Sequence, residues 1–429
     1  RLRFVRSGNG WAQSIASPEA AMPFKAPFEI IDLSHFPDAE QQTEFRQRTA
    51  SLQASFNLQD GPLVRAALFN LGDQRPRYLL IVIHHLATDG VSWGVLLEDL
   101  QTLCKQLGAG AKVELPPKTT SFKNWAERLV VHAQSAALLA EATYWLSLSK
   151  NSSGRLPVDG PGANTAASAR TVSVALDADE TRALLQEVPT AFRTQINEVL
   201  LTALARALSN WTGSRRLLLD LEGHGREDVF EGVDLSRTVG WFTTIFPLML
   251  DLSDSQTPIE ALRLVKEQVR AIPGRGLGYG LLRYGSGDAK IGAALRAQPQ
   301  AEIRFNYLGQ LDRALPESAL FKPASETGAA ANGLSMSQVQ SPLNARGYLL
   351  NIIGSVSGGA LRLEWTYSEN RHLRETVEKV AETYVAELRA LITLSRKAGT
   401  ESFSPSDFPS AKLSHDDLSK VLSQFGRVK

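Results

Sequence analysis

The sequence has few of the residues that mark a secreted, metal-binding or membrane protein. It has one cysteine, Cys104, among 429 residues, so it can form no internal disulfide and has no C-x-x-C zinc site. No apolar run reaches the roughly 18 residues needed to cross a bilayer. A lone cysteine and the lack of a signal-peptide pattern predict a reducing, cytoplasmic location without membrane contact.

Neither sign of charge is in excess. Lys plus Arg number 46 and Asp plus Glu number 45, which gives a net charge of +1. A dedicated nucleic-acid binder usually concentrates basic residues, so we expect no nucleic-acid partner. Hydrophobic residues make up 43% of the chain and charged residues 21%, which is typical of a globular protein. A chain of this length is expected to form two domains or lobes.

Strands and helices are predicted to alternate along the chain, with the strands in hairpins as often as in strand–helix units. The first lobe is predicted over 1–150 and the second over 170–398, joined by a Gly-, Ser- and Pro-rich linker at 151–169. The residues 399–429 are expected to be a linker toward a following module. A strong amphipathic helix is predicted over Thr194–Trp211, with Thr194 as its N-cap.

Two adjacent histidines stand where a buried strand, Arg77–Ile83, is expected to give way to a helix, Gly90–Leu107. Ligands gather at such strand ends in layered α/β proteins. Neighbouring residues on a strand point to opposite faces, so one of His84 and His85 should point inward and the other outward. Asp89 is placed to fix the turn at the helix start. A packed core histidine is the alternative, and ligand spacing for a metal is absent.

A second polar turn follows the predicted strand Arg215–Glu222 and reads EGHGRE. Desolvation would make Glu222 more basic, because burial disfavours the charged form of a carboxyl group. The alternative is an ordinary strand-end carboxylate paired with a nearby arginine such as Arg226. His224 is expected to shape the turn.

These motifs resemble those of the condensation-type domains of nonribosomal peptide synthetases. The first is HHxxxDG at 84–90. Four further stretches resemble the motifs of epimerization domains in the family's order, namely EGHGRE at 222–227, VGWFTTIFP at 239–247, GYGLLRY at 278–284 and FNYLGQ at 305–310. The family's first motif would precede Arg1, so we expect the chain to be a piece of a longer polypeptide with its first lobe truncated at the start.

The resemblance implies an α/β fold of two chloramphenicol-acetyltransferase-like lobes in a V-shaped arrangement with a central tunnel. It implies inversion, from L to D, of the α-carbon of an aminoacyl or peptidyl thioester in nonribosomal peptide synthesis. The substrate would arrive on the 4'-phosphopantetheine arm of a peptidyl carrier protein (thiolation domain). Adjacent synthetase domains would be further partners, and this chain would bind no cofactor or metal of its own.

Inversion needs a base on one face of the α-carbon and an acid on the other. His85 and Glu222 are therefore the predicted catalytic pair, and which of them abstracts the proton stays open. The predicted supporting residues are His84, Asp89, Arg226, Asn306 and Tyr307. Two alternatives remain. A condensation domain would use His85 without a need for Glu222, and a catalytically silent domain would only recruit a carrier protein.

Overall fold

The computed structural model describes most of the chain. The described residues are 1–8, 10–17, 27–148, 154–310, 320–322, 324, 341–397, 403–408, 410–411, 417–418 and 420. They divide into two compact units of mixed α/β structure. The first unit takes its described residues from 1–122, 234–242 and 313–342. The second takes its described residues from 123–233, 243–312 and 343–429.

The chain leaves the first unit near Phe122, earlier than the linker predicted at 151–169. The reason is the packing of helix α4, Ala136–Ser147, into the core of the second unit. Trp145 is 0% exposed and Leu138 is 1% exposed within that core. Composition alone suggested a boundary where the Gly- and Pro-rich stretch begins, but residues 149–153 of that stretch lie outside the described residues.

The first unit is built on a three-stranded sheet of order β3-β4-β5. Its elements are β1 (Leu2–Ser7), β2 (Gly10–Ile15), β3 (Phe28–Asp32), α1 (Asp38–Ala54), β4 (Val64–Asn70), β5 (Tyr78–Ile83), the 3-10 turn η2 (His85–Ala87) and α2 (Gly90–Gly108). β4 runs parallel to β3 and antiparallel to β5. Phe45 of α1 packs on Phe69 of β4 with ring centroids 4.5 Å apart, so one helix closes a small apolar core over the sheet.

The second unit is built on a six-stranded sheet of order β6-β11-β10-β9-β7-β8. The strands are β6 (Ala169–Ala175), β7 (Arg216–Gly223), β8 (Thr244–Asp251), β9 (Ile303–Gln310), β10 (Leu350–Ser357) and β11 (Ala360–Ser368). The other elements are α3 (Phe122–His132), α4, α5 (Ala178–Phe192), α6 (Ile196–Thr212), α7 (Pro258–Arg270), η4 (Pro273–Gly276), α8 (Leu277–Gly280), η5 (Leu281–Gly285), α9 (Ala289–Arg296), α10 (Arg374–Ser395) and η7 (Pro405–Asp407). β10 and β11 form an antiparallel hairpin around Gly358-Gly359.

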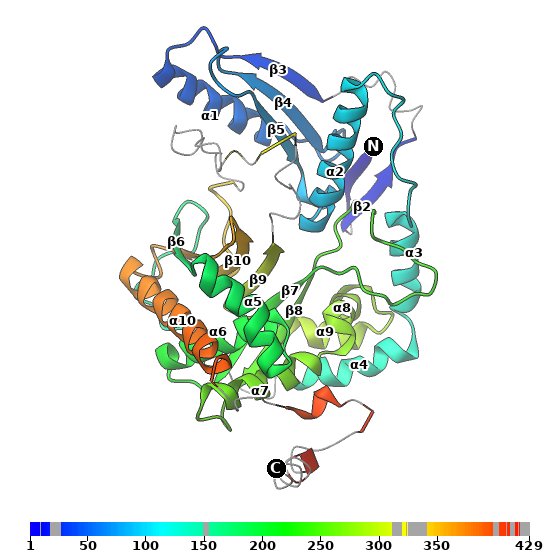
Figure 1. Ribbon diagram of the computed structural model, residues 1–429. Helices are drawn as coiled ribbons and strands as arrows, with labels where there is room; N and C mark the ends of the chain where they lie inside the picture. The colour runs from blue at the N-terminus through cyan, green and yellow to red at the C-terminus, as the bar shows by residue number, and fades with distance from the viewer. Residues whose placement is uncertain are drawn as a thin grey trace. The chain divides into compact units, whose positions relative to one another are not determined.

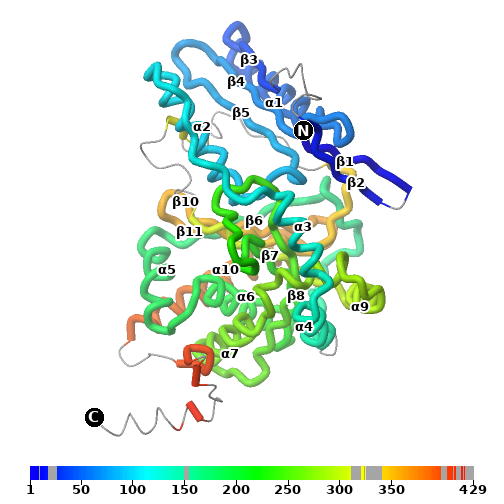
Figure 2. Tube along the Cα trace, turned by 90° about the vertical axis from the view of Figure 1, so that its right-hand side faces the viewer, coloured from blue at the N-terminus to red at the C-terminus, as the bar shows by residue number. Residues whose placement is uncertain are grey.

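The central strands of this sheet have two unlike faces. Along β7, Leu217, Leu219 and Leu221 are buried and alternate with Leu218, Asp220 and Glu222, which are half-buried. The apolar face is covered by α5, α6 and α10, which pack on one another and on the strands (Figures 1 and 2). The opposite face of β7 and β9 is polar. This division places Glu222 on the polar face, away from the main helical layer.

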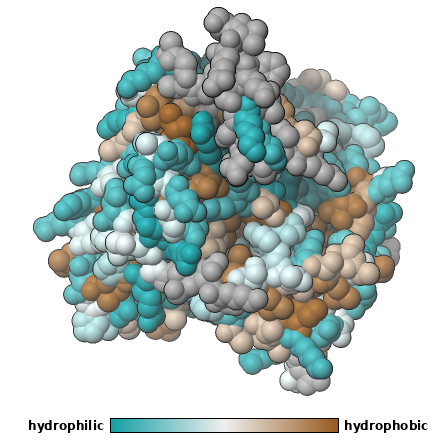
Figure 3. Space-filling view, turned by 90° about the horizontal axis from the view of Figure 1, so that it is seen from below, coloured by the Kyte–Doolittle hydropathy of each residue, from teal (hydrophilic) through white to brown (hydrophobic). Residues whose placement is uncertain are grey.

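The described helices expose mostly polar side chains, with exceptions such as Val130 and Val131 of α3. Seen from below, hydrophilic and hydrophobic side chains are mixed across the surface, and the hydrophobic ones occur in separate groups (Figure 3). No helix among the described residues is both long enough and apolar enough to cross a membrane. Helix α6 begins one residue later than predicted, since Gln195 and not Thr194 is its N-cap. The Gln195 N–H donates to Glu198 at 2.8 Å, which satisfies one of the helix's orphan donors.

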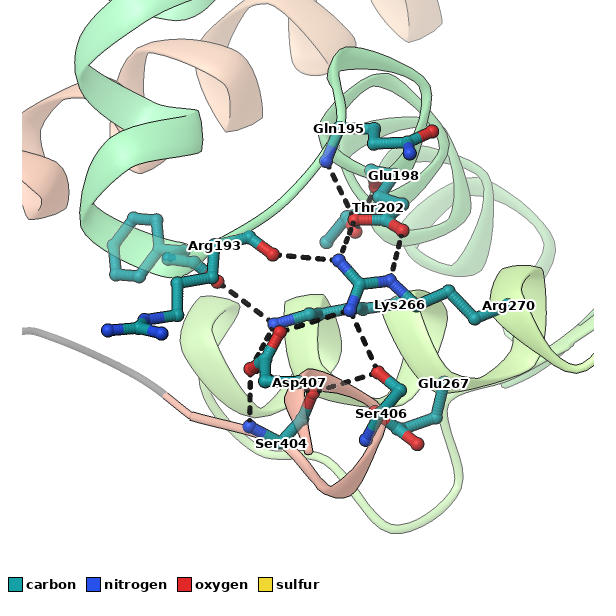
Figure 4. Close-up of polar contacts among 11 residues, drawn as sticks. Arg193, Gln195, Glu198, Thr202, Lys266, Glu267, Arg270, Ser404, Ser406 and Asp407 are labelled. Carbon is teal, nitrogen blue, oxygen red and sulfur yellow. Dashed lines mark hydrogen bonds and ion pairs between the residues drawn. The ribbon is translucent and has the colours of Figure 1, made fainter. Parts of the chain in front are cut away.

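Part of the predicted C-terminal linker is folded onto the second unit. Pro405–Asp407 forms a 3-10 turn, and the Asp407 carboxylate contacts two cationic side chains of α7 (Figure 4). Lys266 Nζ lies 2.7 Å from Asp407 Oδ2, and Arg270 lies 3.0 Å from Asp407 Oδ1. The described residues 403–408 are therefore part of the folded unit, which corrects their assignment to a linker.

Candidate functional site

The two histidines directly follow β5 and have different surroundings. His84 is half-buried, its Nδ1 accepts the Leu86 N–H at 3.2 Å, and its ring stands edge-on to Phe56. Burial and the neighbouring His85 lower the pKa of His84, which favours the neutral ring. His85 is exposed, and its ring centroid lies 4.9 Å from that of Trp241. The two histidines differ in exposure, in the sense predicted, although both lie beyond the end of the strand, and His85 is the more accessible one.

Asp89, which follows the turn at His84 and His85, is hydrogen-bonded to a segment that is distant in the sequence. It is 2% exposed and caps α2, because its Oδ1 accepts the N–H of Ser92 at 2.8 Å. Its Oδ2 accepts the N–H of Phe242 at 3.1 Å. Ser92 is 0% exposed, and its Oγ donates to Gly240 O at 3.0 Å. Trp241 lies between Gly240 and Phe242, which these hydrogen bonds anchor. The same contacts therefore hold the Trp241 ring that packs on His85.

Glu222 lies at the end of β7, as predicted, and is bound by β9. Asn306 Nδ2 donates to Glu222 Oε2, and Arg304 Nε lies 3.2 Å from Glu222 Oε1. The side chain of Glu222 is 13% exposed. Arg304, on the neighbouring strand β9, therefore pairs with Glu222, and Arg216 pairs with Asp251 at 2.7 Å.

Asn306 and Tyr307 do not share one site, although both were predicted to support it. Asp220 and Leu221 of β7 lie beside Arg304 and Phe305 of β9, so the next pair in this parallel register is Glu222 and Asn306. Tyr307 follows on the other face, beside Gly354, and packs against the main core. The structure therefore brings Glu222 and Asn306 together and directs Tyr307 away from them.

The EGHGRE turn is shaped by His224. The Arg226 N–H donates to His224 Nδ1 at 3.0 Å, and His224 Nε2 lies 3.5 Å from Glu227 Oε1. Gly225 has a φ of +68°, a conformation that glycine adopts without strain. The predicted turn-shaping role of His224 is confirmed, and the supporting role of Arg226 stays a prediction.

Two polar residues near Glu222, Asp220 and Arg304, were not predicted. Asp220 lies two residues before Glu222 on the same face of β7 and accepts the Tyr348 hydroxyl at 2.7 Å. Arg304 lies two residues before Asn306 on β9 and donates from Nε to Asn351 at 2.7 Å. Polar residues at every second position of otherwise apolar strands were the available signal. Burial raises the pKa of Asp220.

The described residues hold no group of three or more His, Cys, Asp or Glu side chains with the arrangement of a metal site. His85 belongs to the first unit, whereas Glu222 belongs to the second. Each is presented by its own turn at the end of a strand, β5 and β7 respectively. Their joint action stays a prediction.

Comparison with known proteins shows the family to which this chain belongs. The family model described as "Condensation domain" matches residues 1–414. The chain is 44% identical to a component of the linear gramicidin synthase of Brevibacillus parabrevis, over 99% of this chain and 5% of that protein. It is 43% identical to chondramide synthase cmdD of Chondromyces crocatus, over 99% of this chain and 10% of that protein. The chain thus spans a small part of these relatives.

Among solved structures, the chain resembles the epimerization domain from the third module of tyrocidine synthetase B. The two are 32% identical with a TM-score of 0.81, over 92% of this chain and 85% of that one. The predicted fold class, a chloramphenicol-acetyltransferase-like α/β fold, is confirmed by this similarity. The V-shaped arrangement and the central tunnel stay predictions.

Proposed function

Because this chain belongs to the condensation-domain family, we propose that it inverts the α-carbon of an aminoacyl or peptidyl thioester from L to D. The single observation that carries the proposal is the Glu222 carboxylate, bound by Asn306 and Arg304 where β7 ends. Inversion needs a second acid–base group besides a histidine, and condensation needs none at this position. The similarity to an epimerization domain supports the same choice.

The substrate of this reaction is a thioester on the 4'-phosphopantetheine arm of a peptidyl carrier protein. The arm comes with the substrate, so the chain needs no cofactor of its own. The carrier protein and the adjacent synthetase domains are the partners that this proposal requires.

The chemistry divides between two side chains. The thioester carbonyl acidifies the α-proton, one of His85 and Glu222 removes it, and the other returns a proton to the opposite face. His85 is accessible beside Trp241, and Glu222 is oriented by Asn306. The enolate oxygen needs an N–H donor while the carbanion exists. The His85 ring or the second N–H of the Asn306 amide supplies it.

The test is solvent-deuterium incorporation into a carrier-bound L-aminoacyl thioester. The parent chain is expected to incorporate deuterium at the α-carbon and to yield the D-form. Glu222→Gln keeps the shape of the side chain and removes its acid–base function, so inversion should fall roughly 100-fold or more. His85→Ala should be at least as damaging, because it also removes a ring that can donate to the enolate oxygen.

Two control variants separate chemistry from general damage. Glu364→Gln changes an exposed carboxylate of β11, and His35→Gln changes an exposed histidine of the first unit; both should keep the parent rate. Circular dichroism should show the parent fold in every variant. Amide formation without deuterium exchange would instead establish a condensation domain. A parent chain that does neither would be a silent carrier-recruiting domain.

A further inference from the structure

The polar face of the second unit's sheet holds a connected set of charged and polar side chains around Glu222. Asp220 and Glu222 lie on β7, and Arg304 and Asn306 lie on β9. The parallel register sets Asp220 beside Arg304. Two carboxylates therefore face one guanidinium group and one amide across neighbouring strands.

Arg304 contacts partners on two sides. Its Nε–H donates to Asn351 Oδ1 on β10 at 2.7 Å. The same nitrogen lies 3.2 Å from Glu222 Oε1, and the side chain is 29% exposed. The guanidinium carbon stands 5.4 Å from the centroid of the Tyr348 ring, within the range of a cation–π contact. The guanidinium group is thus held by an amide and an aromatic ring at the position where it meets Glu222.

Tyr348 is itself fixed by a strand of the same sheet. Its hydroxyl donates to Asp220 Oδ2 at 2.7 Å. Burial and the neighbouring Asp220 raise the pKa of the Tyr348 hydroxyl, so this donor stays protonated across the pH range of enzyme assays. The Asp220–Tyr348 hydrogen bond therefore fixes the Tyr348 ring, against which the Arg304 guanidinium group packs.

An acid–base carboxylate needs a defined orientation and a defined charge. Asn306 fixes Oε2 of Glu222 by a hydrogen bond. Arg304 places a positive charge beside Oε1. A nearby positive charge stabilises an ionised carboxylate, whereas burial opposes ionisation. Removing the charge while the carboxylate stays mostly buried should favour the protonated form.

On the basis of the proposed epimerization, we infer that Arg304 is a positioning residue for Glu222. Asn351 and Tyr348 hold Arg304 in place, and Arg304 keeps the Glu222 carboxylate ionised and oriented for proton transfer. No motif of the sequence contains this arginine, and its role follows from the contacts of β7, β9 and β10. Among the described residues, the charged and titratable groups around Glu222 and its partners include Asp220, Arg304, Tyr348, Arg346 and Arg283, and Arg226 follows four residues after Glu222 in the same turn.

The first measurement is the ionisation of Glu222 itself. Carbon-13 labelling of the glutamate side-chain carboxyl carbons gives a titration curve by NMR, and the Glu222 signal is the one missing from Glu222→Gln. In Arg304→Gln the midpoint of this curve should rise by about one pH unit. Arg304→Lys keeps a positive charge and should restore most of the parent midpoint. An unchanged midpoint in Arg304→Gln would overturn the inference, whatever reaction the chain catalyses.

The second measurement is the pH profile of deuterium exchange on the carrier-bound thioester. Arg304→Gln should lower kcat about 10-fold or more and shift the acidic limb to higher pH, with partial recovery in Arg304→Lys. Tyr348→Phe, which loses the bond to Asp220, should shift the limb in the same direction by less. Arg362→Gln, an exposed arginine of β11, is the matched control and should behave as the parent.

The deuterium-exchange assay distinguishes a failure of the proposed epimerization from a failure of the proposed role of Arg304. An inactive parent chain would contradict the proposed epimerization and leave the NMR titration as the test of Arg304. An active parent with an inactive Glu222→Gln and an unaffected Arg304→Gln would contradict only the role of Arg304. A loss of rate in Arg304→Gln with an unchanged acidic limb and no recovery in Arg304→Lys would also overturn it.

Discussion

The ammonium group of Lys266 and the carboxylate of Asp407 form an ion pair of 2.7 Å in which both side chains are almost fully buried. Lys266 Nζ also donates to Phe192 O at 3.1 Å. Arg270 adds a second cation on the Asp407 carboxylate and itself binds Glu198 at 2.8 Å (Figure 4). One short turn of chain thus neutralises a cationic site on α7.

Removing Asp407 should destabilise the second unit. Asp407→Ala leaves the Lys266 charge buried without its carboxylate, and breaking a buried pair in this way costs about 3 kcal/mol or more. We expect the midpoint of urea unfolding to fall accordingly, with an unchanged m-value. Asp254→Ala changes an exposed aspartate of the same unit and should leave the midpoint in place. A parent-like midpoint in Asp407→Ala would show that the ion pairs of Asp407 contribute nothing to stability.

A pair of glycines in α8 offers a matched test of how α4 is held. A Cβ on Gly278 would lie 2.1 Å from Glu141 Oε2 and 2.8 Å from Leu138 Cδ1, whereas a Cβ on Gly280 would meet nothing within 4 Å. Gly278→Ala should therefore force the side chains of Glu141 and Leu138 to shift and lower the free energy of unfolding by about 2 kcal/mol. Gly280→Ala should be neutral or slightly stabilising, because alanine favours a helix. Equal effects of the two substitutions in urea unfolding would contradict this packing.

His372 should make stability depend on pH. It is 1% exposed, its Nε2 lies 3.0 Å from Pro157 O, and burial lowers its pKa below the ordinary value of 6.5. Below pH 6.5 the unfolded chain binds a proton at this histidine that the folded chain does not. Its contribution to stability is therefore complete above that pH and is lost as the pH falls toward the lowered folded pKa.

The variant His372→Gln removes this titration and keeps an N–H donor for Pro157 O. Between about pH 7.5 and about pH 5.5 its unfolding free energy should fall less than that of the parent. His35→Gln, at an exposed position, should follow the parent curve. Identical pH dependence in the parent and in His372→Gln, measured by urea unfolding, would rule the effect out.

The sequence allowed the elements that carry the site to be predicted, because local patterns determine them. The apolar run before His84 predicted β5, and the run before Glu222 predicted β7, each to within a residue or so. Alternation along a strand also predicted that the two histidines differ in exposure. These features depend only on near neighbours in the chain.

The partners of those residues could not be predicted, because they depend on contacts between distant segments. Asp89 was expected to act locally at its turn, but its Oδ2 binds the N–H of Phe242, 153 residues away. The arginine beside Glu222 lies on β9, and no local pattern pairs the two strands in the register that joins Asp220 to Arg304. Sheet order and register are tertiary properties, and they decided that Asn306 meets Glu222 whereas Tyr307 does not.

The hydroxyl of Ser92 links α2 to the segment that carries Trp241. Its Oγ–H is shared between Asp89 Oδ1, at 2.8 Å, and Gly240 O, at 3.0 Å, and its Oγ also accepts the Gly240 N–H at 3.2 Å. Ser92→Ala would leave the Gly240 N–H and carbonyl without this buried partner, at a cost of about 1–3 kcal/mol.

The loss of these hydrogen bonds in Ser92→Ala should also affect His85. The segment that they hold contains Trp241, whose ring packs on His85. Under the proposed epimerization, in which His85 is a catalytic group, we expect Ser92→Ala to lower kcat for thioester inversion about 10-fold with little change in KM, because the Trp241 ring would then orient His85 and not the bound substrate. Thr102→Ala, on the exposed side of the same helix, should leave both constants unchanged. Ser92→Thr keeps the hydroxyl and should recover part of the rate. If Ser92→Ala is destabilised yet turns over at the parent rate, the Trp241 contact does not position His85, and the Asp89–Ser92 link serves only to hold α2 to the 240–242 segment.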